Sequence, residues 1–189
     1  PPRTIIDQES ELNEYVASGK AAWMENQATP SLSASEAINS MPQDNAILLT
    51  TSDHALLTPQ IVDYFCRAAE NSGCDLVVAL ARHETVLDAY PETSRTSYRF
   101  KDGRYCSCNL FAFLTSRART VPSFWRRIEK QRKNPLRVIS ILGWFTVLRY
   151  IVGILPLSEA VDRISKLLGC KVGIAILPYP DAAIDVDTA

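Results

Sequence analysis

Two continuous apolar runs stand out in the pattern of hydrophobic and polar positions, at Ala46–Thr51 and Asp75–Leu80. Such runs, without polar alternation, are typical of strands buried on both faces, as in a parallel sheet. Between them, Thr58 and Pro59 fit the N-cap and first position of a helix that extends to about Asn71. The order strand–helix–strand predicts a βαβ unit, and therefore an α/β fold with a mostly parallel sheet.

Shorter patterns predict further elements. Residues 97–113 have strand character on both sides of an Asp102-Gly103 turn signal, which predicts a β-hairpin. Ser33 and Glu36 match a capping box, so a helix should begin near Ser33. We also expect helices at Glu9–Ala17 and Ser158–Leu168, with Ser158 as the N-cap of the second, and a strand at Lys171–Leu177.

Length, charge and cysteine content narrow the class of protein. The 189 residues suit a single domain over 1–189. The formal net charge of −1 lacks the basic excess of nucleic-acid binders, so we expect no nucleic acid as partner. Five cysteines without a C-x-x-C pair make a poor disulfide framework, and neither His54 nor His83 lies near a cysteine in sequence, as a zinc site would require. We therefore expect buried, reduced thiols and a cytoplasmic location.

A basic block precedes an apolar segment. Eight basic side chains and one acid, Glu129, lie between Arg117 and Arg137, and residues 136–157 are strongly apolar. Arg149 argues against a membrane-spanning helix here, because a central arginine costs about 2.5–3.5 kcal/mol. Two interpretations stay open. Residues 117–168 form a helical insertion folded on the sheet, with a solvated basic face. Alternatively, residues 117–157 dock on an anionic membrane surface or hold an anionic acceptor, through their basic side chains and Trp125, Trp144, Phe145 and Tyr150.

Candidate chemistry lies at the end of the first apolar run, at Asp53 and His54. Ligands of open α/β sheets bind beyond the carboxyl ends of strands, where a carboxylate is well placed to hold Mg²⁺. Asp53 also fits a turn or a helix cap, and His54 fits a phosphate contact or a polar turn residue. Asp185 and Asp187 follow the last predicted strand and supply either a second carboxylate or a solvated acidic tail.

Three segments resemble the MobA-like nucleotidyltransferases of the nucleotide-diphospho-sugar transferase superfamily. Residues 53–59 (Asp-His-Ala-Leu-Leu-Thr-Pro) resemble the family's D-x-P-hh-(S/T)-P segment, with Ala55 in place of the usual proline. Residues 183–189 resemble the closing hDhDTPEDh segment, and residues 108–111 resemble the G-x-N-hh segment. The resemblance covers roughly residues 29–189.

The resemblance implies a Rossmann-like three-layer αβα sandwich that transfers a nucleotidyl group from an NTP to a phosphorylated acceptor and releases pyrophosphate. It implies that Asp53 and Asp187 are the catalytic carboxylates and Mg²⁺ ligands. It also places Ser31 and Ser33 near the nucleotide base and Asn109 at the acceptor.

One departure from the family pattern keeps a second function open. The family begins with a strand and a Gly-rich loop that holds the triphosphate, whereas the seven glycines of this chain are scattered. Together with the absence of Met at position 1, this leads us to expect that the chain lacks the N-terminal part of the domain. The alternative function is a non-catalytic nucleotide- or anion-binding module of the same fold, with possible association with a membrane surface. A Gly-rich loop encoded upstream of Pro1 would favour the enzyme.

Overall fold

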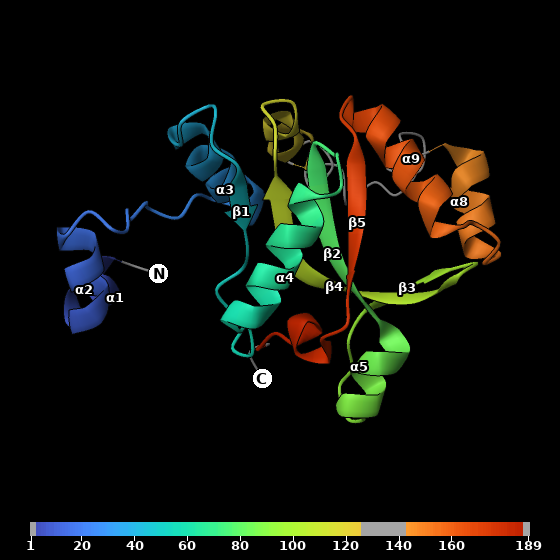
Figure 1. Cartoon of the computed structure of the whole chain (residues 1–189), viewed down its shortest axis with the longest axis horizontal. Helices are drawn as coiled ribbons and strands as arrows, with labels where there is room; N and C mark the ends of the chain where they lie inside the picture. The colour runs from blue at the N-terminus through green and yellow to red at the C-terminus, as the bar shows by residue number, and fades with distance from the viewer. Residues whose placement is uncertain (1–2, 126–142, 187–189) are drawn as a thin grey trace.

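The computed structural model describes residues 3–125 and 143–186. Its strands are β1 Ile47–Leu49, β2 Leu76–Arg82, β3 Ser97–Phe100, β4 Gly103–Phe113 and β5 Val172–Leu177. They form one sheet in the order β1-β4-β2-β5, and β3 pairs with β4 outside this path (Figure 1). The described chain is thus a mixed α/β structure with an open sheet.

Helices precede and connect the strands. Their bounds are α1 Arg3–Gln8, α2 Ser10–Ala17, α3 Pro30–Ser40, α4 Pro59–Glu70, α5 His83–Ala89, α8 Trp144–Ile151 and α9 Leu157–Leu168, with short 3-10 helices η1 Ala118–Thr120 and η2 Pro180–Ala183. The pair α1 and α2 lies apart from the sheet in Figure 1, and an extended segment joins it to α3. Among the described residues, no helix has both the length and the apolar content needed to cross a bilayer.

The prediction of a mostly parallel sheet is wrong. Of the four strand pairings in the described residues, only β2 with β5 is parallel, because β4 pairs antiparallel with β1, β2 and β3. Strands β1, β2 and β5 still run in the same direction. The long second strand of the predicted hairpin lies between β1 and β2, so the expected βαβ unit exists without direct contact between its two strands. The continuous apolar runs reflect burial of the strands on both faces, which occurs in this mixed sheet as it does in a parallel one.

Two apolar clusters lie on opposite faces of the sheet. Val77, Ala79 and Ala81 of β2 belong to a cluster with residues of α4, α5 and η2. Leu76 of β2 belongs to the other cluster, with residues of α3 and η1 and with packing from α9. Because alternate residues of a strand face opposite sides, β2 contributes to both cores. The result is a helix–sheet–helix layering in the described residues, while the Rossmann-like assignment stays a prediction.

Helix α3 has a different N-cap from the one expected. Helix α3 begins at Pro30, and the Thr29 side chain accepts a hydrogen bond from Leu32 N–H at 3.3 Å, so Thr29 and not Ser33 is its N-cap. The same Thr-Pro pattern begins α4, as predicted, with Thr58 accepting from Ile61 N–H. Proline at the first helical position has a suitable φ and no N–H to leave unpaired, so it sets the start more firmly than a later serine.

Most of the predicted insertion at 117–168 is described. It contains η1, a helical stretch at 121–125, α8 and α9, while residues 126–142 lie outside the described residues. Helix α9 begins at Leu157 after Pro156, without the expected side-chain cap from Ser158, and ends at Gly169, which has a left-handed conformation. Arg119 of η1 is buried and donates hydrogen bonds to the backbone carbonyls of Ile38, Met41, Pro42 and Asn45. The insertion therefore fastens the segment between α3 and β1.

Asp75 precedes β2 and connects it to the start of β5 and to the end of β4. These contacts lie at the edge of the sheet opposite the carboxyl ends of β1, β2 and β5. Its carboxylate accepts hydrogen bonds from the Thr115 hydroxyl and from Lys171 N–H, both at 2.7 Å. Its backbone N–H donates to the Lys171 carbonyl, and its carbonyl accepts from Leu114 N–H. The hydrogen bonds from Thr115 and Lys171 hold the pKa of Asp75 below its usual value.

We expect Asp75→Asn to lower the free energy of unfolding by about 1–2 kcal/mol at neutral pH, because an amide offers one acceptor to two donors. The carboxylate contributes stability above its unfolded pKa, and this is lost as the pH falls through its lower folded pKa. Urea unfolding at pH 7 and at about pH 3 measures both effects. Asp162→Asn, on exposed α9, is the control. Equal stabilities of the Asp75→Asn variant and the native protein at pH 7 would contradict this role.

Candidate functional site

The carboxyl ends of β1, β2 and β5 lie at one edge of the sheet, because these strands run in the same direction. The loop after β1 carries Asp53, and the segment after η2 carries Asp185 and Val186. Val186 N–H donates a 2.9 Å hydrogen bond to the Asp53 carbonyl, which holds the C-terminal segment against the loop. Residues more than 130 positions apart in sequence therefore meet where ligands of such sheets bind.

Asn109 reaches this edge from a bulge in β4. The pairing with β2 shifts between Val78 and Leu80, so β4 carries extra residues there. Asn109 has a φ of +48°, a conformation that asparagine tolerates better than most residues. Its side chain donates a 3.3 Å hydrogen bond to the Asp185 carboxylate and accepts one from the Ser107 hydroxyl. A residue held in this conformation by its surroundings is typical of binding sites.

Arg95 is the cation of the site. Its guanidinium forms an ion pair with Asp185 and donates a 3.4 Å hydrogen bond to the Ser107 carbonyl. The side chains of Arg95 and Asp185 are 16% and 10% exposed, so the pair is largely shielded from water. The Arg95 Nε–H is buried and has no partner among the described residues. Both carboxylate oxygens of Asp185 thus have partners, while the Arg95 Nε–H has none among the described residues.

His54 is buried next to Asp53 with both ring nitrogens lacking partners in the described part of the chain. Burial lowers the pKa of His54, and the positive charge of Arg95 lowers it further, against the opposing effect of Asp53. The imidazole is therefore neutral at physiological pH and offers one donor and one acceptor. Buried polar groups are nearly always hydrogen-bonded, so the imidazole of His54 can bind a polar group of a ligand.

Asp53 itself is exposed, and in the described part of the chain its carboxylate has no ion pair or side-chain hydrogen bond. An exposed, unpaired carboxylate at a strand end fits a Mg²⁺ ion, which takes one or two carboxylates and keeps several waters. The second expected ligand, Asp187, lies outside the described residues. Among the described residues, no group of three or more metal-binding side chains occurs.

A pocket of about 640 Å³ lies between α3 and the end of β1. Ser31 and Ser33 line it from α3, and Thr50–Ser52 line it from the loop that continues to Asp53. Phe111 and Trp125 form its aromatic side, with ring centroids 5.2 Å apart and nearly perpendicular planes. Its size and mixed lining are typical of small-molecule sites.

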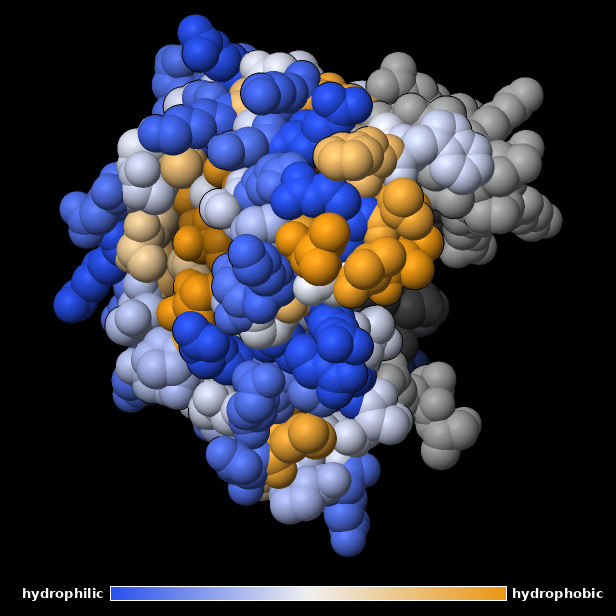
Figure 2. Space-filling model, turned by 90° about the vertical axis from the view of Figure 1, so that its right-hand side faces the viewer, coloured by the Kyte–Doolittle hydropathy of each residue, from blue (hydrophilic) through white to orange (hydrophobic). Residues whose placement is uncertain are grey.

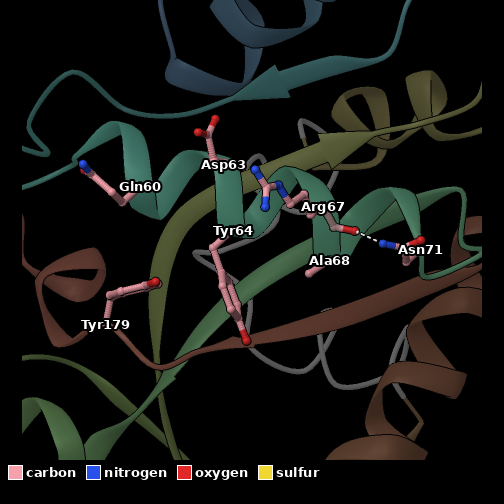
Figure 3. A pocket seen from close by; sticks show the side chains of 7 residues that line it. All are labelled: Gln60, Asp63, Tyr64, Arg67, Ala68, Asn71 and Tyr179. Atoms are coloured by element: carbon pink, nitrogen blue, oxygen red, sulfur yellow. Dashed lines mark hydrogen bonds between the residues drawn. The ribbon is translucent and has the colours of Figure 1, made fainter.

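A second hollow, of about 500 Å³, lies on the outer side of α4 beside Tyr179 (Figure 3). The side chains of Asp63 and Tyr64 point in opposite directions there, so its polar groups do not converge on one point. Its lining residues do not include Asp53, His54 or Asn109. This hollow is therefore a weaker candidate than the pocket beside Asp53.

The five cysteines are free, and three of them, Cys106, Cys108 and Cys170, are buried. The fold brings His83 Nδ1 to 3.4 Å from Cys106 Sγ, a contact that sequence spacing did not suggest. Burial raises the pKa of Cys106, and raises that of Cys108 to about 12. The buried thiols are therefore protonated and do not act as nucleophiles.

The structure connects the loop of Asp53 and His54 to Asn109 through Val186 and Asp185, and Ser31 and Ser33 line the adjoining pocket. Their functional roles stay predictions. Sequence reasoning missed Arg95, which lies in the loop between α5 and β3 and belongs to no recognisable motif. Asp185 was the one sequence feature that pointed to a cation at this site, because a carboxylate that becomes largely buried needs a cationic partner.

The pH dependence of the free energy of unfolding should depend on the protonation of His54. The unfolded chain carries His54 near its ordinary pKa of 6.5, so falling pH protonates the unfolded state first. We expect the free energy of unfolding to fall from about pH 7 to pH 5, by at most about 1.4 kcal/mol per pH unit from this group. Urea unfolding of the native protein and of His54→Gln measures the slope. An unchanged slope in the variant would refute this assignment, and His83→Gln is the matched control.

Two substitutions of Asn109 separate the contributions of backbone strain and of hydrogen bonding to stability. Asn109→Gly loses the hydrogen bond to Asp185 but accepts the positive φ, whereas Asn109→Ala loses the bond and adds strain. We therefore expect the alanine variant to be less stable than the glycine variant by about 1 kcal/mol. Chemical denaturation compares the two. If the glycine variant were the less stable, the left-handed conformation would not be what selects asparagine here.

Comparison with known proteins supports a transferase fold. No family model matches the sequence, and no curated protein matches it. The chain is similar to a solved structure described as a hypothetical transferase from Thermus thermophilus, with a TM-score of 0.76 and 26% sequence identity. The match covers 86% of this chain and 69% of the Thermus chain. The α/β fold of this protein is thus shared with a protein named as a transferase.

Proposed function

We propose that the protein is a Mg²⁺-dependent nucleotidyltransferase that uses an NTP and a phosphorylated small-molecule acceptor. The observation that carries the proposal is the position of the Ser31/Ser33 pocket directly beside the loop that presents Asp53. A volume of about 640 Å³ accommodates a nucleoside, and the aromatic and hydroxyl groups suit a base and a ribose. The transferase description of the Thermus protein agrees with this class of chemistry.

In the proposed reaction, a phosphate oxygen of the acceptor attacks the α-phosphorus of the NTP. A new P–O bond forms, the bond from the α-phosphorus to the bridging oxygen of the β-phosphate breaks, and pyrophosphate leaves with that electron pair. Such transfers need positioning and charge stabilisation more than covalent catalysis. The protein groups needed are therefore hydrogen-bond donors, cations and carboxylates in fixed positions.

The residues of the strand-end edge fit these roles. Asp53, with Asp187 as the resemblance implies, would hold Mg²⁺, which when bound offsets the charge of the phosphates. His54 and the free Nε–H of Arg95 are buried donors that lack partners among the described residues and can serve phosphate oxygens. Asn109 is held at this edge by Ser107 and Asp185, where it can orient the acceptor.

A non-catalytic nucleotide-binding module is the second candidate. The scattered glycines favour it, because no Gly-rich loop in this sequence would hold a triphosphate through its backbone N–H groups. The two candidates differ in turnover. Only the enzyme releases pyrophosphate, and it does so in proportion to acceptor consumed.

Calorimetric titration of the full-length protein with ATP, CTP, GTP and UTP, with and without MgCl₂, tests the proposal. We expect one NTP to bind in a Mg²⁺-dependent manner, and Asp53→Asn to weaken that binding about tenfold or more. Asp63→Asn, on the outer side of α4, should bind as the native protein does. Failure of every NTP to bind with Mg²⁺, or an unchanged affinity in Asp53→Asn, would overturn the proposal. Mg²⁺-dependent binding without pyrophosphate release in the presence of phosphorylated acceptors would favour the binding module.

A further inference from the structure

Large apolar side chains are exposed along α8 and the turn that follows it. Trp144, Phe145, Leu148 and Ile151 of α8 are 58–73% exposed, and Val152 and Ile154 are 61% and 50% exposed. Most other large apolar side chains on the described surface are less than half exposed. Figure 2, which faces this side of the molecule, shows hydrophobic side chains gathered there. We call the six residues the α8 face.

The α8 face points outward because the other side of the helix is fastened to the body. Tyr150 packs edge-to-face on Phe100 of β3, with ring centroids 5.5 Å apart. Arg149 forms an ion pair with Glu159 of α9 and lies over the ring of Phe145. Lys101 N–H donates a 2.9 Å hydrogen bond to the Leu155 carbonyl, which ties the following turn to the hairpin. The α8 face is therefore a fixed surface of the fold.

The spacing of the apolar residues fits one continuous stripe. Positions 144, 148, 151 and 152 recur at the intervals that place residues on one side of a helix, and Phe145 lies next to Leu148 on that side. An exposed apolar surface of this kind on a soluble domain marks an interaction site. Two of the aromatic residues expected there take no part, since Tyr150 packs on Phe100 and Trp125 packs on Phe111 and Phe113.

The charges around the α8 face indicate the kind of partner. Within 143–158, the described residues of α8 and its flanks, the sequence contains no acidic residue and one basic residue, Arg149, which pairs with Glu159 of α9. Arginines stand at both ends of the helix, with Arg163 beside Gly143 and Arg99 beside Gly153. Exposed apolar side chains flanked by basic ones suit an anionic bilayer, where the apolar groups enter the lipid and the cations meet the headgroups.

We propose that the α8 face binds the surface of anionic lipid membranes, with Trp144, Phe145, Leu148 and Ile151 inserted below the headgroups and Arg99 and Arg163 at headgroup level. Contact of this kind is peripheral, because α8 has eight residues and lies along the surface of the domain. The proposal is independent of the nucleotidyl transfer, since none of these residues lines the pocket beside Asp53.

Flotation with vesicles tests the proposal on the full-length protein. We expect binding to vesicles of phosphatidylcholine and phosphatidylserine at a 7:3 ratio, weak binding to pure phosphatidylcholine, and loss of binding at high salt. The double variant Phe145→Ser and Ile151→Ser should reduce the partition coefficient about tenfold or more. Arg163→Gln should reduce it about fivefold on the anionic vesicles. Because these side chains are exposed, far-ultraviolet circular dichroism and thermal unfolding should match the native protein.

The matched control is Leu12→Ser with Tyr98→Ser, two exposed apolar side chains outside the α8 face, and it should bind as the native protein does. No flotation with anionic vesicles would overturn the proposal, as would equal binding to neutral vesicles or unchanged binding in the Phe145/Ile151 variant. Light scattering supplies a further outcome. A dimer that disappears in the Phe145/Ile151 variant, without any vesicle binding, would assign the α8 face to a second copy of the chain.

Discussion

Backbone pairing by β4 is the constraint on which the sheet depends. Among the strands that the structure describes, β1, β2 and β3 pair with β4, and β5 pairs with β2. Residues 111–113 pair with β1 on one side and β2 on the other, so both apolar cores meet at this strand. The bulge in the same strand turns Asn109 toward Asp185. A single strand thus fixes the layering and the position of the candidate site.

Elements with strong local signals could be predicted from the sequence. Thr58-Pro59 specifies the start of α4, and the Asp102-Gly103 pair specifies the turn between β3 and β4, because few residues satisfy those backbone requirements. No comparable sequence signal indicates whether the adjacent strand runs parallel or antiparallel. A strand buried on both faces is apolar whether its partners are parallel or antiparallel, so β2 suggested a parallel sheet although β4 lies beside it.

The candidate site was partly predictable for a related reason. Asp53 follows an apolar run, so the sequence places it near a strand end, and in the structure it lies in the loop after β1. Arg95 follows no strand and matches no motif, and its relation to Asp185 is created only by folding. His54 could be located, but its burial and lowered pKa depend on Arg95 and on the packing around the loop. The ion pair of Arg95 and the lowered pKa of His54 therefore could not be predicted from the sequence, because both depend on contacts between residues far apart in the chain.

The wide separation of the site residues bears on the order of events during synthesis. Asn109 precedes its partner Asp185 by 76 residues, which at about 5–20 residues per second corresponds to several seconds of translation. Over that interval Arg95 and Asn109 have left the ribosome without the carboxylate that later neutralises and orients them, and β2 lacks β5 on one edge. The nascent chain can form the hairpin and α4 before Asp185 and Val186 are synthesised, whereas the hydrogen bond between Val186 and Asp53 has to wait for them.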